Sequence, residues 1–222
     1  MSEDAPEMPS PEALLARPFF FVGIGGSAEL NSILFNTSGA GIAIAGTSGK
    51  STVTGMLGWI LFHAGRDPTI MNGAAMKNFG ASAVTGAGGL YVSEVDESDG
   101  SIALYRPAVG VLLNVSLDHM GMDELRALFA DYLARSRIAV VNADDGEALA
   151  LLRHAKEAIT FAIDEPRAQI GVVPGSVADA PNRQAALVID RHDDSEHALR
   201  LPLPGRHNLA NAIAAIAGAA AA

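Results

Sequence analysis

Cysteine is absent from the 222 residues of this sequence. The absence excludes disulfide bonds, zinc sites built on thiolates and cysteine nucleophiles. The sequence also lacks the basic start and apolar run of a secretory signal, and no apolar run approaches the roughly 20 residues that cross a bilayer. We therefore expect a cytoplasmic protein without membrane insertion.

Positive charge is scarce, since 15 Lys and Arg residues face 25 Asp and Glu residues and the formal net charge is −10. Because non-specific nucleic-acid binding depends on clustered Lys and Arg that neutralise phosphates, we expect no nucleic-acid partner. Aromatic residues make up only 5% of the chain, but hydrophobic residues make up 49%, which is enough to bury a core. Abundant Gly and Ala favour a wound α/β protein over a β-sandwich.

Strand-like and helix-like segments alternate through residues 42–155, which predicts βαβ units and a mostly parallel sheet flanked by helices. Residues 158–203 hold strand-like pieces between Pro and Gly and predict a small extra β portion. The predicted strands are residues 19–24, 42–46, 89–96, 108–115 and 138–142, and the predicted helices are residues 28–36, 51–64, 122–135, 145–155 and a last stretch from about 207.

A glycine-rich segment lies between a predicted buried strand and a predicted helix, where a phosphate-binding loop belongs. It reads Gly46-Thr47-Ser48-Gly49-Lys50-Ser51-Thr52. Glycines let backbone N–H groups approach phosphate oxygens, and the helix N-terminus adds partial positive charge. Lys50 would reach the outer phosphates, and the Ser51 hydroxyl would hold Mg²⁺. An ordinary glycine-rich turn with an exposed lysine is the less favoured interpretation.

The loop is shorter than the general Walker pattern, which has a glycine where this chain has Ile44. The form G-T-x-G-K-[ST]-[ST] resembles the loop of Mur ligases and folylpolyglutamate synthases. Further segments resemble the Mur ligase family in the expected order, and EVDESD is similar to the E-A-D-E-S-D of its alanine-adding branch. They are residues 21–27 (FVGIGGS), 94–99 (EVDESD), 114–120 (NVSLDHM) and 205–212 (GRHNLANA).

These segments also have physical interpretations. Glu94 ends a predicted strand, where ligands of parallel sheets bind, and Mg²⁺ prefers such oxygen ligands, although an acidic solvated loop is the alternative. Imidazole is an unusual Mg²⁺ ligand, so His119 is a candidate only because the resemblance implies it. Asn208 and Asn211 share one helical face and suit an adenine edge, but Asn208 is equally suited to cap the last helix.

The resemblance implies ATP and Mg²⁺ as cofactors, and UDP-N-acetylmuramate and L-alanine as substrates joined through an acyl phosphate. It implies Lys50, Glu94 and His119 as catalytic residues, and Ser51, Glu94 and His119 as the metal site. The loop residues 46–52 would bind ATP together with His207, Asn208 and Asn211. The UDP-substrate residues would be Gly23, Gly25, Gly26 and Ser27.

The sequence departs from a complete three-domain member of the family. Only some 20 residues separate Gly25 from the phosphate-binding loop, where the family has about a small domain, and the chain ends soon after the segment at residues 205–212. We expect a tail and a remnant of the UDP-binding domain in residues 1–36, the central ATP-binding domain in residues 37–222, and no C-terminal domain. Ser48 also stands where the alanine-adding branch usually has His.

Two alternatives differ in function. One is another Mur-like ligase, acting on a recycled peptide or as a folylpolyglutamate-type enzyme. The other is a non-catalytic ATP-binding module that serves a partner.

Overall fold

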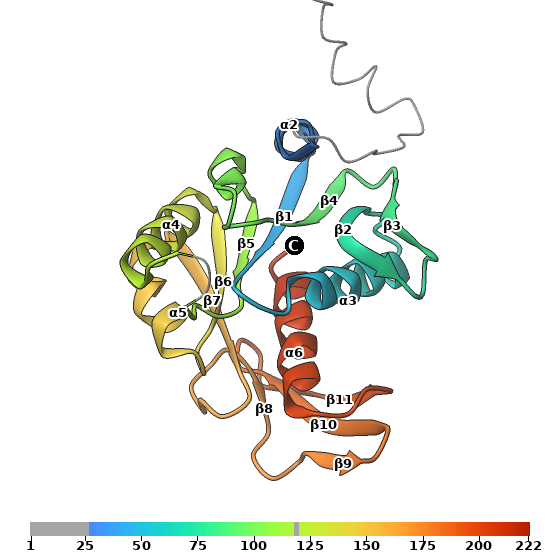
Figure 1. The fold of residues 1–222 in the computed structure, drawn as a ribbon. Coiled ribbons are helices and arrows are strands. Elements are labelled where there is room, and N and C mark those ends of the chain that lie inside the picture. Colours follow the sequence, from blue (N-terminus) through green and yellow to red (C-terminus); the bar gives the residue numbers. More distant parts are fainter. Residues whose placement is uncertain (1–26, 118–119) are drawn as a thin grey trace, which may run out of the picture.

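The computed structural model describes residues 27–117 and 120–222. Helices alternate with strands along most of this length (Figure 1). The helices are α2 (Ser27–Thr37), α3 (Lys50–His63), η1 (Ser101–Leu104), α4 (Met122–Arg135), α5 (Gly146–Leu151), η2 (Leu152–His154) and α6 (Arg206–Ala220). The strands are β1 (Ala40–Ala45), β2 (Thr69–Met76), β3 (Ala81–Val84), β4 (Leu90–Glu94), β5 (Val109–Leu112), β6 (Ile138–Asn142), β7 (Glu157–Ala162), β8 (Ile170–Val172), β9 (Ala178–Ala180), β10 (Arg183–Asp190) and β11 (Ser195–Leu201).

All these strands belong to one sheet, in the order β11-β10-β8-β7-β6-β5-β1-β4-β2-β3, with β9 paired to β10. The neighbours from β8 through to β2 run parallel, while β3, β9, β10 and β11 pair antiparallel. The expected fold class, a mostly parallel sheet flanked by helices with a small extra β portion, is confirmed. The extra portion is the β8–β11 end of the sheet.

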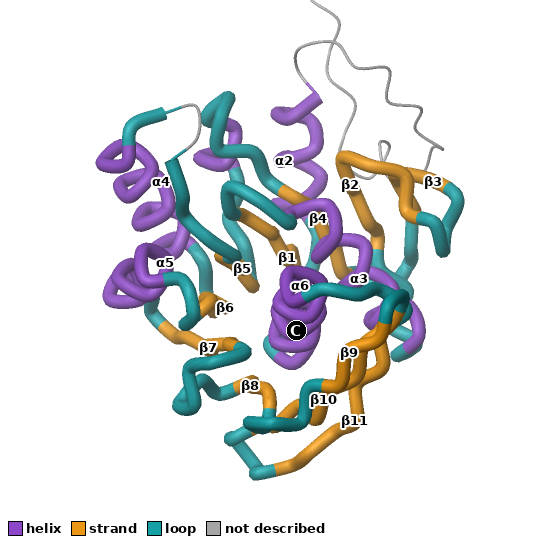
Figure 2. Tube along the Cα trace, turned by 60° about the horizontal axis from the view of Figure 1, so that its bottom comes forward, coloured by secondary structure: helices purple, strands orange, loops and turns teal. Residues whose placement is uncertain are grey.

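Strand β1 is buried on both faces, and its side chains alternate between two cores. Ile42 and Ile44 join the core under α3 and α6. Ala43 and Ala45 join the core under α2, α4 and α5. Figure 2 shows the helices of these two groups on opposite sides of the sheet. A strand covered in this way reads as a continuous apolar run, which explains why IAIA was recognisable in the sequence.

The hairpin of β2 and β3 was assigned to no element from the sequence. Strand β2 contains Asn72, Gly73 and two alanines, residue types that strands disfavour, and its pairing with β3 is irregular between Met71 and Met76. It is held instead by pairing with β4 on one side and β3 on the other. Tertiary pairing therefore overrides weak local propensity here.

The remaining boundaries differ little from expectation. Residues 145–155 form the short α5 followed by the 3-10 turn η2, and the last helix begins at Arg206. The predicted strand at residues 19–24 lies outside the described residues. Among the residues that the structure describes, no helix has the length and apolar character needed to cross a bilayer.

Candidate active site

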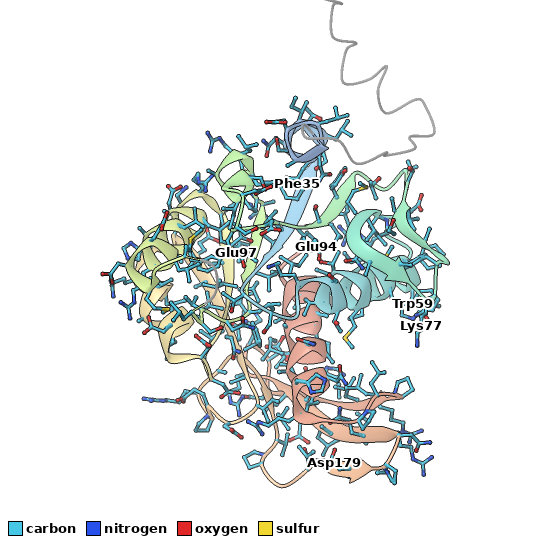
Figure 3. All side chains as sticks on the ribbon, viewed as in Figure 1. Phe35, Trp59, Lys77, Glu94, Glu97 and Asp179 are labelled. Atoms are coloured by element: carbon cyan, nitrogen blue, oxygen red, sulfur yellow. The ribbon has the colours of Figure 1, made fainter. Side chains whose placement is uncertain are left out.

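The loop between β1 and α3 lies at the carboxyl edge of the sheet, where ligands of open α/β sheets bind. Strands β4 and β5 pair with β1 on its two sides, so the residues that follow them converge on this loop. Glu94 ends β4, and Asn114 follows β5. Figure 3 shows the labelled Glu94 and Glu97 near the middle of the molecule, where β1 gives way to α3.

Two glycines give the loop its shape. Gly46 has φ 136° and Gly49 has φ 88°, a region that residues with a Cβ atom rarely adopt. A Cβ at Gly46 would also lie 3.0 Å from Cβ of Leu113 and 3.2 Å from the backbone N of Asn114. The backbone therefore passes close over the end of β5, with the N-terminus of α3 directly behind it.

Asn114 holds the loop through both ends of its side-chain amide. Its Oδ1 accepts hydrogen bonds from Oγ1 of Thr47 at 2.8 Å and from the backbone N–H of Ser48 at 2.9 Å. Its Nδ2 donates to the backbone oxygen of Ser48 at 3.0 Å. Oγ of Ser116 adds a contact of 2.8 Å to Oγ1 of Thr47. Asn114 begins the segment at residues 114–120, and no role was predicted for it.

Lys50 begins α3 and points back into the loop. Its Nζ donates to the backbone oxygen of Gly46 at 2.8 Å and to both carboxylate oxygens of Glu97, at 3.1 and 2.9 Å. The Glu97 side chain is 6% exposed and that of Lys50 is 19% exposed. Glu97 is a site residue that the sequence analysis did not single out, although it lies within the acidic segment at residues 94–99.

Ser51 and Glu94 form the second contact between the loop and β4. Oγ of Ser51 donates to Oε2 of Glu94 at 2.7 Å, and Nδ2 of Asn72 donates to the backbone oxygen of Ser51 at 3.1 Å. Oδ1 of Asn72 is buried and has no hydrogen-bond partner among the residues that the structure describes. A Cβ at Gly73 would lie only 2.0 Å from Oε1 of Glu94, so β2 closes this side of the site. Asn72 was not predicted as a site residue, because strand β2 was not predicted.

The oxygen atoms gathered here fit Mg²⁺. A hydroxyl, a carboxylate and an unpaired amide oxygen are hard ligands, and Mg²⁺ usually takes only one or two carboxylates and completes its shell with water and phosphates. The described residues hold no group of three or more His, Asp or Glu side chains arranged for a metal. Ser51 and Glu94 are thus the residues of this edge that would hold the ion.

Helix α6 reaches the loop through Asn211. A Cβ at Gly49 would lie 2.7 Å from Oδ1 of Asn211, so this side chain rests directly on the loop. Asn208 lies one turn earlier, and its Nδ2 donates to the backbone oxygen of Pro204 at 2.7 Å. The N-cap of α6 is Gly205, and no side-chain hydrogen bond caps the helix there. Asn208 therefore does not cap α6, which was the alternative interpretation of this residue.

Similarity to known proteins assigns the chain to a family. Residues 44–219 match the family model described as the Mur ligase middle domain. The chain belongs to the Mur ligase family. A UDP-N-acetylmuramate–L-alanine ligase of Clavibacter sepedonicus is 37% identical over 182 residues, which cover 79% of this chain and 37% of that protein. One of Laribacter hongkongensis is 36% identical over 193 residues, covering 80% of this chain and 39% of that protein.

Solved structures show the same fold. The UDP-N-acetylmuramate–alanine ligase of Thermotoga maritima has a TM-score of 0.72 at 24% identity, covering 85% of this chain and 43% of that one. A UDP-N-acetylmuramate:L-alanyl-γ-D-glutamyl-meso-diaminopimelate ligase from Neisseria has a TM-score of 0.73 at 24% identity, covering 87% of this chain and 64% of that one. The chain spans 37% to 39% of the length of the two curated relatives named above.

Within this Mur ligase middle domain, the predicted phosphate-loop residues do lie together. Gly46, Thr47, Ser48 and Gly49 form the loop, Lys50 and Ser51 begin α3, and Thr52 is exposed on its first turn. Glu94 and Asn211 contact this group, while Asn208 is half-buried and His207 exposed at the start of α6. His119, Gly23, Gly25 and Gly26 lie outside the described residues, and only the backbone of Ser27 is described.

The start of α6 in the Mur ligase middle domain is attached by Asp144, which follows β6. Its carboxylate accepts the backbone N–H groups of Ile163 at 2.6 Å and Glu165 at 2.9 Å, and also that of Asp164. Asp164 in turn forms an ion pair with Arg206. These contacts tie the turn after β7 to β6 and to the first residue of α6, while the position of the helix itself follows from its packing in the core under α3.

Proposed function

We propose that this chain is the ATP-binding core of a cytoplasmic ligase that joins L-alanine to UDP-N-acetylmuramate, a precursor of peptidoglycan. The observation that carries the proposal is the phosphate-binding loop between β1 and α3, with Lys50, Ser51 and Glu94 gathered on it. Relatives with 36% to 37% identity carry the name of this ligase, which supports the choice of substrates.

In the proposed complex, the backbone N–H groups of the loop and the first turn of α3 bind the phosphates of ATP. Lys50 would neutralise the outer phosphates. Asn211, with Asn208 and His207 at the start of α6, would bind on the adenine side. Ser51, Glu94 and His119 would hold Mg²⁺, which supplies positive charge beside the transferring phosphoryl group when it is bound.

The proposed reaction has two steps. A carboxylate oxygen of the lactyl group attacks the terminal phosphorus of ATP, and the bond from that phosphorus to the bridging oxygen breaks. ADP departs, and the lactyl group becomes an acyl phosphate. The amine of L-alanine then attacks the acyl carbon, loses a proton and expels phosphate to leave an amide. This chain would contribute by binding and orienting ATP and by neutralising the charge that develops on the transferring phosphoryl group.

We further propose the division of the chain into residues 37–222 as the central domain and residues 1–36 as a tail with a remnant of the UDP-binding domain. All but the last residue of helix α2 lies before that boundary, yet Nδ2 of Asn31 donates to Oγ of Ser93 at 3.0 Å and to the hydroxyl of Tyr105 at 2.8 Å. Whatever its origin, α2 is packed on the central sheet.

The variant Lys50→Ala tests the proposed role of the loop in ATP turnover. Lys77→Ala, on the exposed turn after β2, is the matched lysine control. We expect Lys50→Ala to lower ATP turnover at least about 100-fold, because a fixed cation on the developing charge is lost. ADP release should depend on both UDP-N-acetylmuramate and L-alanine. Full turnover by Lys50→Ala would contradict the assignment of this loop.

The acceptor needs a separate test, because a ligase that acts on the L-alanyl-γ-D-glutamyl-meso-diaminopimelate peptide has an equally similar fold. A panel of amine donors in the same assay, including this tripeptide and glutamate, distinguishes the alternatives. L-alanine should support the fastest ADP release. A preference for the tripeptide would assign the chain to the recycling type, and ADP release that needs glutamate together with a folate in place of UDP-N-acetylmuramate would assign it to the folylpolyglutamate type. ATP binding without turnover with any donor, measured on the full-length protein that carries this domain, would favour the non-catalytic module.

A further inference from the structure

Glu97 forms an ion pair with the ammonium group of Lys50, the group that the loop would offer to the outer phosphates of a nucleotide. Both carboxylate oxygens of Glu97 lie within 3.1 Å of Nζ. As a residue, Glu97 is only 5% exposed. A buried carboxylate is costly unless it is paired, so Lys50 stabilises Glu97 where it lies.

The segment that carries Glu97 is held by its backbone and not by this side chain alone. The N–H of Val95 donates to the backbone oxygen of Ile44 at 2.9 Å, and the N–H of Ile102 donates to that of Asp96 at 3.1 Å. The N–H of Gly100 also donates to the backbone oxygen of Glu97 at 3.2 Å. The turn can therefore keep its place while the Glu97 side chain changes rotamer.

We propose that Glu97 is an internal substitute for the outer phosphates, which neutralises Lys50 in the absence of nucleotide and releases it when a polyphosphate binds. The inference rests on the proposed nucleotide binding. The ammonium of Lys50 has three donors, and the backbone oxygen of Gly46 already takes one at 2.8 Å. A phosphate and the Glu97 carboxylate would compete for the rest, and two anions on one half-buried cation repel each other.

Competition of this kind depends on which phosphates the nucleotide carries. Lysines of phosphate-binding loops reach the outer phosphates and not the one next to the ribose. Glu97 should therefore weaken the binding of ATP and ADP and leave the binding of AMP unchanged. A residue that only shaped the loop would affect all three nucleotides alike.

The experiment is titration calorimetry of the protein with AMP and with a non-hydrolysable ATP analogue plus Mg²⁺, for wild type and Glu97→Gln. Glutamine keeps a hydrogen-bond acceptor for Lys50 but removes the charge. We expect roughly tenfold tighter binding of the ATP analogue, the effect of losing one charge-assisted hydrogen bond that competes with it. AMP affinity should be unchanged, and the melting temperature without nucleotide should fall by a few degrees.

Glu147→Gln is the matched control, because it removes the same charge from an ion pair with Arg126 on the α4 and α5 side. This control should leave the affinities for AMP and for the ATP analogue unchanged. If Glu97→Gln does not fold, Glu97→Asp keeps the charge, withdraws it by one methylene, and should tighten binding of the ATP analogue by a smaller factor.

Unchanged or weaker binding of the ATP analogue by Glu97→Gln, beside a wild type that binds it, would overturn the inference alone. A structure of the nucleotide complex with Glu97 still bonded to Lys50 would do the same. A wild-type protein that does not bind the analogue would overturn the proposed function together with the inference.

Discussion

At the scale of single residues, the site depends on positions where no side chain fits. Gly49 ends the loop in a left-handed conformation at φ 88°, and the space where its Cβ would lie belongs to Oδ1 of Asn211. The residue thus serves two purposes, the turn into α3 and the close approach of α6. The sequence indicated the first, because glycine in a strand-to-helix turn has a local meaning, and it could not indicate the second.

The variant Gly49→Ala separates these two effects when it is compared with Gly65→Ala. Gly65, after the other end of α3, has φ 72°, and no atom of the described part of the chain lies within 4 Å of its Cβ position. Both changes should destabilise the fold by about 1–2 kcal/mol through backbone strain. Only Gly49→Ala should also lower nucleotide affinity more than tenfold, because its methyl group displaces Asn211 and the loop. Calorimetry and urea denaturation measure the two quantities, and equal affinity in both variants would refute the double role.

At the scale of elements, the close approach of α2 to the sheet depends on one aromatic ring and one glycine, in addition to the hydrogen bonds of Asn31. Phe35 is 1% exposed and makes edge contacts with Tyr91 and Tyr105, at ring-centroid distances of 5.7 and 5.1 Å. The ring occupies the space above Gly41 of β1, where a Cβ would lie 2.4 Å from Cε1 of Phe35. The helix approaches β1 closely because this position of the strand has no side chain.

We expect Gly41→Ala to destabilise the protein by about 1–3 kcal/mol, because a rigid ring and a buried strand leave the added methyl group no room. Phe35→Leu in the same background removes ring atoms and should recover part of the loss. A double-mutant cycle by urea denaturation measures the coupling. Strict additivity of the two changes would show that Phe35 and Gly41 do not contact each other in solution.

At the scale of the whole molecule, the tyrosines concentrate in one of the two cores. All three tyrosines of the chain, Tyr91, Tyr105 and Tyr132, belong to the core under α2, α4 and α5. Burial raises the pKa of each above its ordinary value of 10.0. The hydroxyl of Tyr132 donates to the backbone oxygen of Ala43 at 2.8 Å, in the middle of β1. Ionisation of these groups is therefore coupled to opening of the core.

This coupling predicts alkaline unfolding with a defined sign. Because each folded-state pKa lies above the unfolded value, the stability from the neutral tyrosines is fully present below pH 10.0 and is lost as the pH rises above it. The urea midpoint should fall above pH 10.0, and tyrosinate absorbance should appear together with unfolding. The urea midpoint of the Tyr132→Phe variant should fall less steeply with pH, although the variant loses about 1 kcal/mol of stability with the hydrogen bond. Tyrosinate that forms in the folded protein would contradict the prediction.

Much of the architecture could be predicted from local patterns. The continuous apolar runs of β1, β5 and β6 and the amphipathic α4 were recognisable, since hydrophobic periodicity is a property of neighbouring residues. The hairpin of β2 and β3 was not, because its glycine and alanine content carries no such pattern. The position of the loop at residues 46–49 was predicted from its glycines and from the lysine that follows.

Local patterns in the sequence were enough to predict most helices and strands of residues 40–155, the place of the phosphate-binding loop and the resemblance to Mur ligases. Three contacts are seen only in the folded chain: Glu97 pairs with Lys50, Asn72 donates to Ser51, and Asn211 rests on Gly49. These contacts depend on β4 and β5 lying on either side of β1 and on α6 packing beside α3. The order of strands in a sheet is set by how distant segments bury one another, and no local pattern contains that information.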